Sequence, residues 1–202
     1  VYNDGERPDD MSLKLKFNII LMVTGLIGIV ISGYISFNLQ REHARSEALQ
    51  TADILLESAM AVRNYTVEEI RPLLAKIDDN EFEPQSVPAY AAARYIENLH
   101  KQHPDYHYKE AAINPTNPAN KATDWETDII YYFQGSDAKR LIGERDTPSG
   151  RSLYLSKPIR ITNEKCLACH STPDVAPKEV TDRYGTVNGF GWKLNEVIGT
   201  QV

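Results

Sequence analysis

Two cysteines and a histidine stand together near the C-terminal end of the chain, where residues 166–170 read Cys-Leu-Ala-Cys-His. Cys-x-x-Cys-His is the attachment signature of c-type haem. The two thiols add across the two vinyl groups of one porphyrin, and the adjacent imidazole ligates the iron. The sequence therefore predicts one covalently attached haem c, held by Cys166 and Cys169, with His170 as an axial ligand of the iron.

Other uses of this motif make different demands on the chain. A zinc site would need two ligands besides the cysteines, and His100, His103 and His107 could supply them. A dithiol redox motif requires a thioredoxin-like βαβ context, which the pattern of the sequence does not offer. A disulfide within the motif would have to satisfy a demanding bridge geometry. The histidine directly after the second cysteine favours haem over all three.

The composition excludes several classes of function. Of 202 residues, 42% are apolar and 25% are charged, as in a folded domain. The net charge of −6 leaves no basic surplus for phosphates, so nucleic-acid binding is not expected. Two cysteines are too few for a disulfide-rich scaffold. We find no catalytic triad, phosphate-binding loop or carboxylate pair, and expect that the chain is not an enzyme.

One stretch is apolar enough to cross a membrane. The 24 residues between Lys16 and Arg41 carry no charge, and about 20 residues suffice to span the hydrocarbon core. The run is longer than the apolar part of a signal peptide and lacks a clean cleavage site after it. We therefore expect a short N-terminus over residues 1–16, a transmembrane helix over 17–37 in the lipid bilayer, and a haem domain over 38–202.

The haem motif indicates the orientation of this helix. Lysines before the run and arginines after it nearly balance, so the positive-inside rule does not decide. Haem c is attached on the outer side of the bacterial cytoplasmic membrane. The prediction is a single-pass inner-membrane protein with a cytoplasmic N-terminus and a periplasmic haem domain.

Helical signals dominate the first half of the remaining chain. Apolar residues at helical spacing predict that one helix continues out of the membrane to about Asn64. Thr66 and Glu69 predict a capping box for a short helix, and residues 77–88 read as a polar loop. Ser86 is predicted to cap a further helix that includes Pro88 and ends near residue 100.

Strand signals follow. Residues 105–113 predict a strand, whereas the prolines in 114–120 exclude regular structure there. Thr123 and Glu126 form a second capping box that opens another helix. Together these elements predict an α+β domain in which helices flank a small antiparallel sheet. Its remaining strands are expected near 139–145, 151–161 and 187–194.

Six blocks of the chain beyond the apolar stretch carry a family resemblance: AMAVRNYTVEEIRP (59–72), QSVPAYAA (85–92), NPTNPANKATDWE (114–126), CLACH (166–170), AP (176–177) and YGTVNGFGWKLNEVIGTQV (184–202). They resemble the periplasmic c-type haem domains with a PAS-like core, a family represented by a cyanobacterial haem protein with His/Cys axial ligation. The resemblance implies a PAS-like antiparallel sheet with the haem held against it and His170 as one axial ligand. In many members the domain is the sensor of a bacterial signalling protein whose chain continues into a second membrane helix and an output module.

The sequence departs from that relative at the second axial ligand. The relative's ligand is a cysteine on the first periplasmic helix, and residues 59–64 of this chain contain none, which excludes His/Cys ligation. A vacant or weakly occupied sixth site is favoured, with Arg63 and Tyr65 as donors beside it. The alternatives are Met60, one of the histidines at 100, 103 and 107, or an aromatic residue such as Tyr131 or Tyr132.

Further side chains are candidates for haem contacts. Asn114 and Asn117, with the prolines that follow them, are expected either to close a loop over the haem edge or to form a bare turn. Trp125 and Trp192 could donate to propionates or pack in the core, and packing is favoured.

Two functions fit these features. The first is a sensor of redox state or of a diatomic gas, whose helix 38–64 transmits the change and forms a homodimer. The second is an electron-transfer cytochrome c that is tethered beside a respiratory or photosynthetic complex and exchanges electrons with a redox partner protein.

Overall fold

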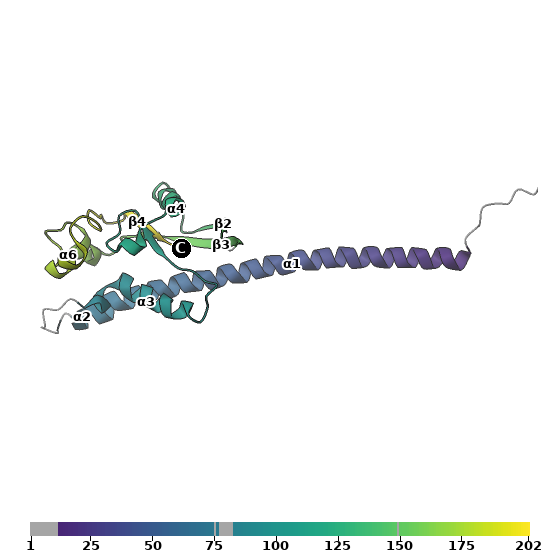
Figure 1. Cartoon of the computed structure of the whole chain (residues 1–202), viewed down its shortest axis with the longest axis horizontal. Helices are drawn as coiled ribbons and strands as arrows, with labels where there is room; N and C mark the ends of the chain where they lie inside the picture. The colour runs from purple at the N-terminus through teal and green to yellow at the C-terminus, as the bar shows by residue number, and fades with distance from the viewer. Residues whose placement is uncertain (1–11, 75, 77–82, 149) are drawn as a thin grey trace, which may run out of the picture. The chain divides into compact units, whose positions relative to one another are not determined.

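The computed structural model describes residues 12–74, 76, 83–148 and 150–202. The chain forms two compact units, residues 1–48 and 49–202. The helix α1 (Leu13–Tyr65) runs through the boundary between them (Figure 1). The expected continuation of the N-terminal helix to about Asn64 is therefore confirmed.

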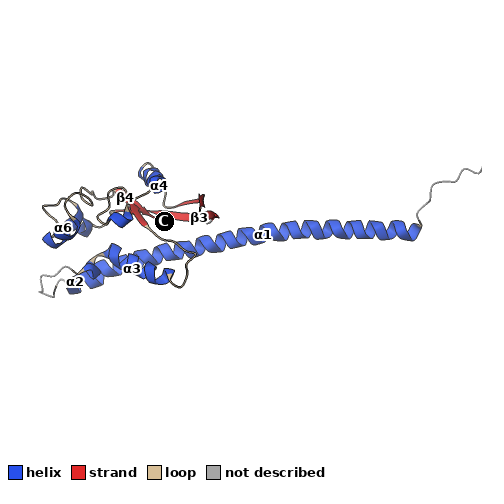
Figure 2. Cartoon of the chain, in the orientation of Figure 1, coloured by secondary structure: helices blue, strands red, loops and turns tan. Residues whose placement is uncertain are grey.

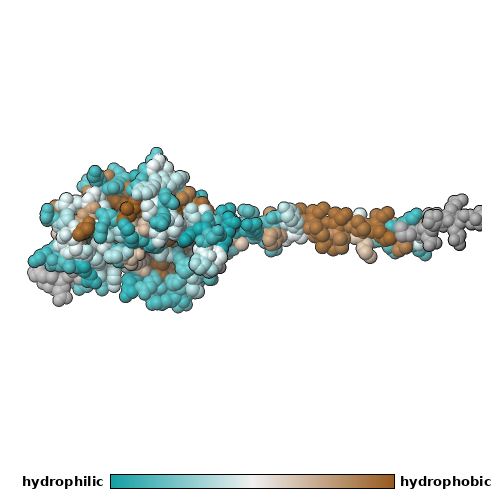
Figure 3. Space-filling view, turned by 45° about the horizontal axis from the view of Figure 1, so that its top comes forward, coloured by the Kyte–Doolittle hydropathy of each residue, from teal (hydrophilic) through white to brown (hydrophobic). Residues whose placement is uncertain are grey.

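The described part of the N-terminal unit is an exposed helix with a long apolar stretch. An 18-residue window of this helix has a mean hydropathy of 2.2, and none of the window is buried. Apolar residues cover this stretch of α1 in Figure 3. By length and composition the helix is able to cross a membrane, although a signal sequence has the same properties. The transmembrane segment over 17–37 and its orientation remain predictions, and residues 1–11 lie outside the described part.

The second unit begins with helical turns that differ from those predicted. After α1 the chain continues as a π-helix η1 (Thr66–Ile70), a turn α2 (Arg71–Leu74), a 3-10 turn η2 (Pro84–Ser86) and the helix α3 (Pro88–His100). The predicted capping box at Thr66 is wrong, because its hydroxyl donates to the Val62 carbonyl inside a continuing helix (2.8 Å). The predicted cap at Ser86 is also wrong, since Val87 precedes α3 without a side-chain cap. Half of the predicted loop at 77–88 lies outside the described part, and the other half holds η2 and the first residue of α3.

Four antiparallel strands form one sheet in the order β1-β4-β3-β2, which confirms the α+β prediction (Figure 2). The strand expected at 187–194 is wrong, because Gly189 and Gly191 adopt φ of 82° there, a left-handed conformation outside the range of a strand. The expected strand at 105–113 shortens to three residues. The strands are β1 (Glu110–Ala112), β2 (Leu141–Thr147), β3 (Gly150–Arg160) and β4 (Val197–Gln201).

Helices cover both faces of this sheet. On one face, Ala59 of α1 packs with Ala92 and Ile96 of α3, and on the other Phe133 of the helix α4 (Asp124–Gln134) packs with Val197 of β4. Successive side chains of a strand point to opposite faces of the sheet, so both faces can pack against helices. The unit is completed by the short elements η3 (Pro118–Asn120), η4 (Glu164–Cys166), α5 (Leu167–His170) and α6 (Lys178–Tyr184).

The start of α4 confirms the second predicted capping box. Glu126 accepts hydrogen bonds from the backbone N–H and the hydroxyl of Thr123 (2.7 and 2.9 Å). The same carboxylate pairs with the Lys109 ammonium at 2.7 Å. Burial alone would raise the pKa of Glu126, but the hydrogen bonds from Lys109 and Thr123 outweigh burial and lower that pKa.

Replacing this carboxylate should weaken the fold in a pH-dependent way. Glu126→Gln should cost about 1–2 kcal/mol at neutral pH, because the Lys109 ion pair and a charged cap are lost. Because folding lowers the pKa of Glu126, its ionised carboxylate stabilises the folded state at pH values above the ordinary pKa of 4.5. This stabilisation is lost as the pH falls through the lowered pKa. Thermal unfolding from pH 7 to pH 3 should therefore show the variant and wild type converging in acid. The exposed Asp128, changed to Asn on the same helix, should shift stability by less than about 0.5 kcal/mol at every pH. A gap that stays constant with pH would contradict the assignment.

Candidate functional site

Strand pairing brings the cysteine motif next to a glycine-containing loop. The motif follows β3, the loop precedes β4, and these two strands are hydrogen-bonded neighbours. At the motif itself, the Trp192 N–H donates to the His170 carbonyl (3.2 Å) and the Gly191 N–H donates to the Ser171 carbonyl (2.8 Å). The loop therefore holds the C-terminal end of the motif through its backbone.

The two thiols lie on one side of a helical turn. Cys166 ends η4 and Cys169 lies three residues later in α5, a spacing that puts both side chains on the same face. Both thiols are free and half-buried. Burial raises the pKa of the Cys166 thiol, while the charges of Arg63 and Arg71 partly offset that effect.

The imidazole of His170 is fixed in one orientation. Its Nδ1 lies 2.7 Å from the Gly189 carbonyl oxygen, which can only accept, so Nδ1 carries the proton and Nε2 keeps its lone pair. The ring stacks on the indole of Trp192 with centroids 3.8 Å apart and planes 15° apart. Burial, aided by the charges of Arg63 and Arg71, lowers the pKa of His170. The side chain is therefore held as a neutral imidazole, the form that ligates metals.

Asn114 supports the carbonyl that holds His170. Its Oδ1 accepts from the Gly189 N–H (3.3 Å) and its Nδ2 donates to the Phe190 carbonyl (3.4 Å). Asn117, by contrast, is exposed and caps the turn η3 by accepting from the Ala119 N–H (3.1 Å). The structure thus brings Asn114 to the motif and gives Asn117 a local role in its own turn.

The two asparagines allow a matched test. Asn114→Ala should cost about 1 kcal/mol and should loosen the Gly189 carbonyl, so that the Nδ1 proton of His170 exchanges faster with water. Asn117→Ala removes a cap of similar energy but should leave that exchange rate unchanged. Proton NMR of the imidazole N–H in both variants provides the measurement. Equal exchange rates in both variants would contradict a role of Asn114 behind His170.

Two arginines from the first helices lie near the motif. The Arg71 Nη2 is 3.6 Å from the Cys169 sulfur, and Arg63 acts electrostatically on Cys166 and His170. Arg63 also pairs with the Glu110 carboxylate at 2.5 Å. The sequence analysis named Arg63 but missed Arg71. The π-helix between them changes the helical phase, and such insertions recur at functional sites. The approach of Arg71 to Cys169 joins residues 98 apart in sequence, so helical spacing alone could not indicate it.

The structure places the remaining candidates elsewhere or at the surface. Met60 and Tyr65 lie on α1 with 38% and 58% of their surface exposed. Trp125, in the first turn of α4, packs against Tyr154, with the Arg145 guanidinium 4.0 Å from its ring centroid. The other candidates for the sixth ligand, Tyr131, Tyr132, His100, His103 and His107, come from α4 and from the α3–β1 segment.

The residues at the motif fit a covalently bound haem. Two free thiols on one face and a neutral imidazole with an available Nε2 are the donor set that this group requires. Beside them, the Thr116 hydroxyl is buried and has no hydrogen-bond partner. No group of three or more histidine, cysteine or acidic side chains in the described residues is arranged to hold a metal ion.

Comparisons with known proteins give one similar structure and one matching family. The crystal structure of the cyanobacterial heme-protein Tll0287 is similar in fold, with a TM-score of 0.59 and 13% sequence identity over 77% of this chain and 92% of that chain. A search of curated proteins gives no match. The Tll0287-like family matches residues 40–202, which include the cysteine motif, the glycine-containing loop and the whole sheet. The chain belongs to the Tll0287-like family.

Proposed function

We propose that the second unit binds one haem c through Cys166 and Cys169, with His170 as an axial ligand. The observation that carries this proposal is the state of His170, whose Nδ1 proton is held by the Gly189 carbonyl while Nε2 remains available. The haem supplies one-electron redox chemistry and a site for a diatomic ligand when bound. Family membership supports the proposal, because the related structure is that of a heme-protein.

Residues around the motif orient the His170 side chain and supply positive charge beside the thiols. The Gly189 carbonyl and the Trp192 ring hold the His170 imidazole in one orientation, so little motion is needed for ligation. Arg63 and Arg71 supply positive charge beside the thiols, which suits the carboxylates of a porphyrin.

We further propose that the domain senses redox state or a diatomic gas at the periplasmic face of the inner membrane. Two features support this role: the helix α1 enters the haem-binding unit directly, and its Arg63 lies near the cysteine motif. Electron transfer to a partner protein remains the second candidate. The thiols are only half-buried, so a haem bound to them would have an edge near the surface, and electron exchange requires such an edge.

Covalent attachment can be tested with the motif and a neighbouring control. In a host that matures c-type cytochromes, the intact chain should gain the mass of one haem. Cys166→Ser and Cys169→Ser should each leave one thioether and shift the pyridine haemochrome band. Ser171→Ala, which alters a side chain directly after the motif, should attach haem as wild type does. Attachment that survives removal of both cysteines would overturn the proposal.

Binding of carbon monoxide to the reduced protein distinguishes gas sensing from redox sensing and electron transfer. A reduced spectrum that shifts on adding the gas would show an open sixth site and support gas sensing. A low-spin spectrum that the gas leaves unchanged would favour redox sensing or electron transfer. Reduction by a membrane quinol or a cytochrome at catalytic rates would then select electron transfer over sensing.

A further inference from the structure

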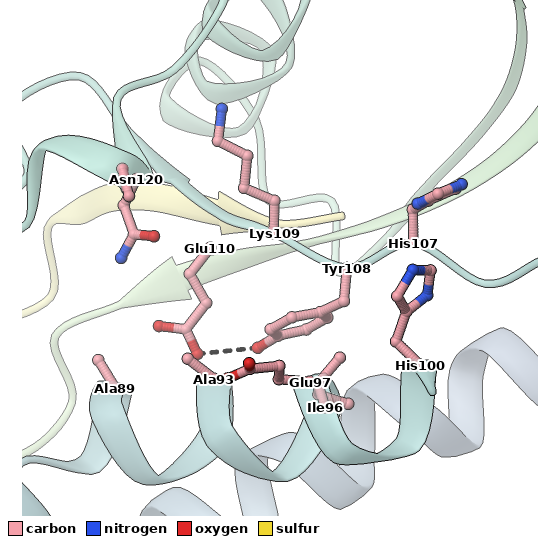
Figure 4. Close-up of a pocket in the computed structure, with 11 residues that line it drawn as sticks. Ala89, Ala93, Ile96, Glu97, His100, His107, Tyr108, Lys109, Glu110 and Asn120 are labelled. Carbon is pink, nitrogen blue, oxygen red and sulfur yellow. Dashed lines mark hydrogen bonds between the residues drawn. The ribbon is translucent and has the colours of Figure 1, made fainter. Parts of the chain in front are cut away.

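A cleft of about 310 Å³ lies away from the cysteine motif, between α3 and the segment that leads into β1. This volume is at the lower end of small-molecule sites. Figure 4 shows its two walls, with Ala89, Ala93 and Glu97 on α3 and with Tyr108 and Glu110 on the opposite segment. The cleft has an apolar part and a polar part. Small apolar side chains on its wall leave the space open, and polar groups line its rim.

The small side chains of α3 create the room. Ala89 and Ala93 lie one helical turn apart, and Ile96 continues the same wall. A larger residue at either alanine would fill the space. The apolar wall is therefore short, and it suits an aliphatic group of a few carbons rather than a long chain.

The polar atoms that remain available are mainly acceptors. The His100 Nδ1 donates to the Tyr106 carbonyl (2.9 Å), so its Nε2 keeps a lone pair. The Tyr108 hydroxyl is already used, since it donates to Glu110 at 2.8 Å, as the dashed line in Figure 4 marks. His107 and Asn120 complete the rim.

The charges that face the cleft favour a cation. Of the two carboxylates on the lining, Glu110 pairs with Arg63, which leaves Glu97 as the carboxylate that can meet a ligand. The lysine on the lining, Lys109, extends away from α3 in Figure 4 and pairs with Glu126. Glu97 also pairs with Arg94, but both side chains are more than half exposed (54% and 60%), and such pairs hold little energy. A ligand that donates several hydrogen bonds and carries positive charge matches this lining.

The geometry points to a binding site for a small primary ammonium compound with a short aliphatic tail. The ammonium group lies at the Glu97 and His100 side of the cleft, and the tail lies against Ala89 and Ala93. This site is separate from the haem site and does not depend on it.

Three probes of equal length test the site by calorimetric titration and ligand-observed NMR. n-Butylammonium should bind with millimolar affinity, whereas n-butanol and n-butyrate should bind at least fivefold more weakly. Ala93→Leu should reduce the butylammonium affinity at least tenfold and Glu97→Gln at least threefold. Ala44→Leu, the same enlargement on the exposed N-terminal part of α1, should leave the affinity unchanged.

Several outcomes would overturn the assignment. Equal binding of butanol and butylammonium would show that charge plays no part, and unchanged affinity in Ala93→Leu would place the binding elsewhere. The titration reads binding directly, so a chain without haem would fail the proposed function and still report on the cleft.

Discussion

Gly189→Ala should destabilise the haem-binding unit by about 2–4 kcal/mol and should lower the yield of haem-loaded protein. Gly189 adopts φ of 82°, and a Cβ at this position would lie against the Thr116 hydroxyl, 2.8 Å from the Thr116 Cβ and 2.9 Å from its Cα. The last contact involves backbone, so rotation of the threonine side chain cannot relieve it. Since the Gly189 carbonyl holds His170, a displaced backbone should also release the imidazole.

Gly191 provides the matched control for this substitution. It has the same φ of 82°, but a Cβ there would meet no atom within 4 Å. Gly191→Ala should therefore show only the conformational cost, about 1 kcal/mol. Thermal unfolding should separate the two variants by roughly 2–12 °C, given the usual shift of about 2–4 °C per kcal/mol for a chain of this size. Equal losses in the two variants would contradict the close packing of Gly189 on Thr116.

Arg63→Met should destabilise the domain by about 2–4 kcal/mol, because it leaves a buried carboxylate without its cation. The Glu110 side chain is only 8% exposed, and its remaining partner is the Tyr108 hydroxyl. Burial and the Glu110 charge raise the pKa of Tyr108, so this hydroxyl stays protonated as a donor. Glu110→Gln should cost less, since Arg63 is 21% exposed and can turn toward water. The double variant should recover part of the loss.

An exposed pair with the same geometry serves as the control. The Arg94 Nη1 and Glu97 Oε2 are also 2.5 Å apart, but both side chains are largely exposed. A double-mutant cycle by thermal or denaturant unfolding should give a coupling of about 1–3 kcal/mol for Arg63 and Glu110. For Arg94 and Glu97 the coupling should be below about 0.5 kcal/mol. Similar couplings for the two pairs would contradict the burial of the Arg63–Glu110 pair.

The sequence predicted the elements that local rules control. Thr123 and Glu126 specify the start of α4 through side chains three residues apart, and the structure has the capping box they predict. The strands near 139–145 and 151–161 are likewise present, because alternating residues and the turn between them are local signals. The haem motif was visible for the same reason, since its three residues are adjacent in sequence.

Features that depend on distant residues could not be predicted. Residues 187–194 alternate as a strand would, yet the packing of Gly189 on Thr116 places them in a loop with positive φ. The link from Asn114 through Gly189 to His170 joins segments 75 and 19 residues apart. Arg71 approaches Cys169 across 98 residues, after a π-helix that no propensity rule indicates. Such contacts depend on the order of the strands in the sheet and on the direction in which each helix points its side chains, which local sequence rules do not give.

The central claim is that haem is covalently attached beside a fixed His170, and one measurement tests it most directly. The chain is produced in a host that matures c-type cytochromes and is extracted with acidified acetone, which removes haem that is not covalently bound. We predict that the extracted protein keeps a Soret band and a c-type pyridine haemochrome, and that His170→Ala keeps the haem but changes its spin state. Protein without a Soret band, or haem that leaves with the solvent, would contradict the account.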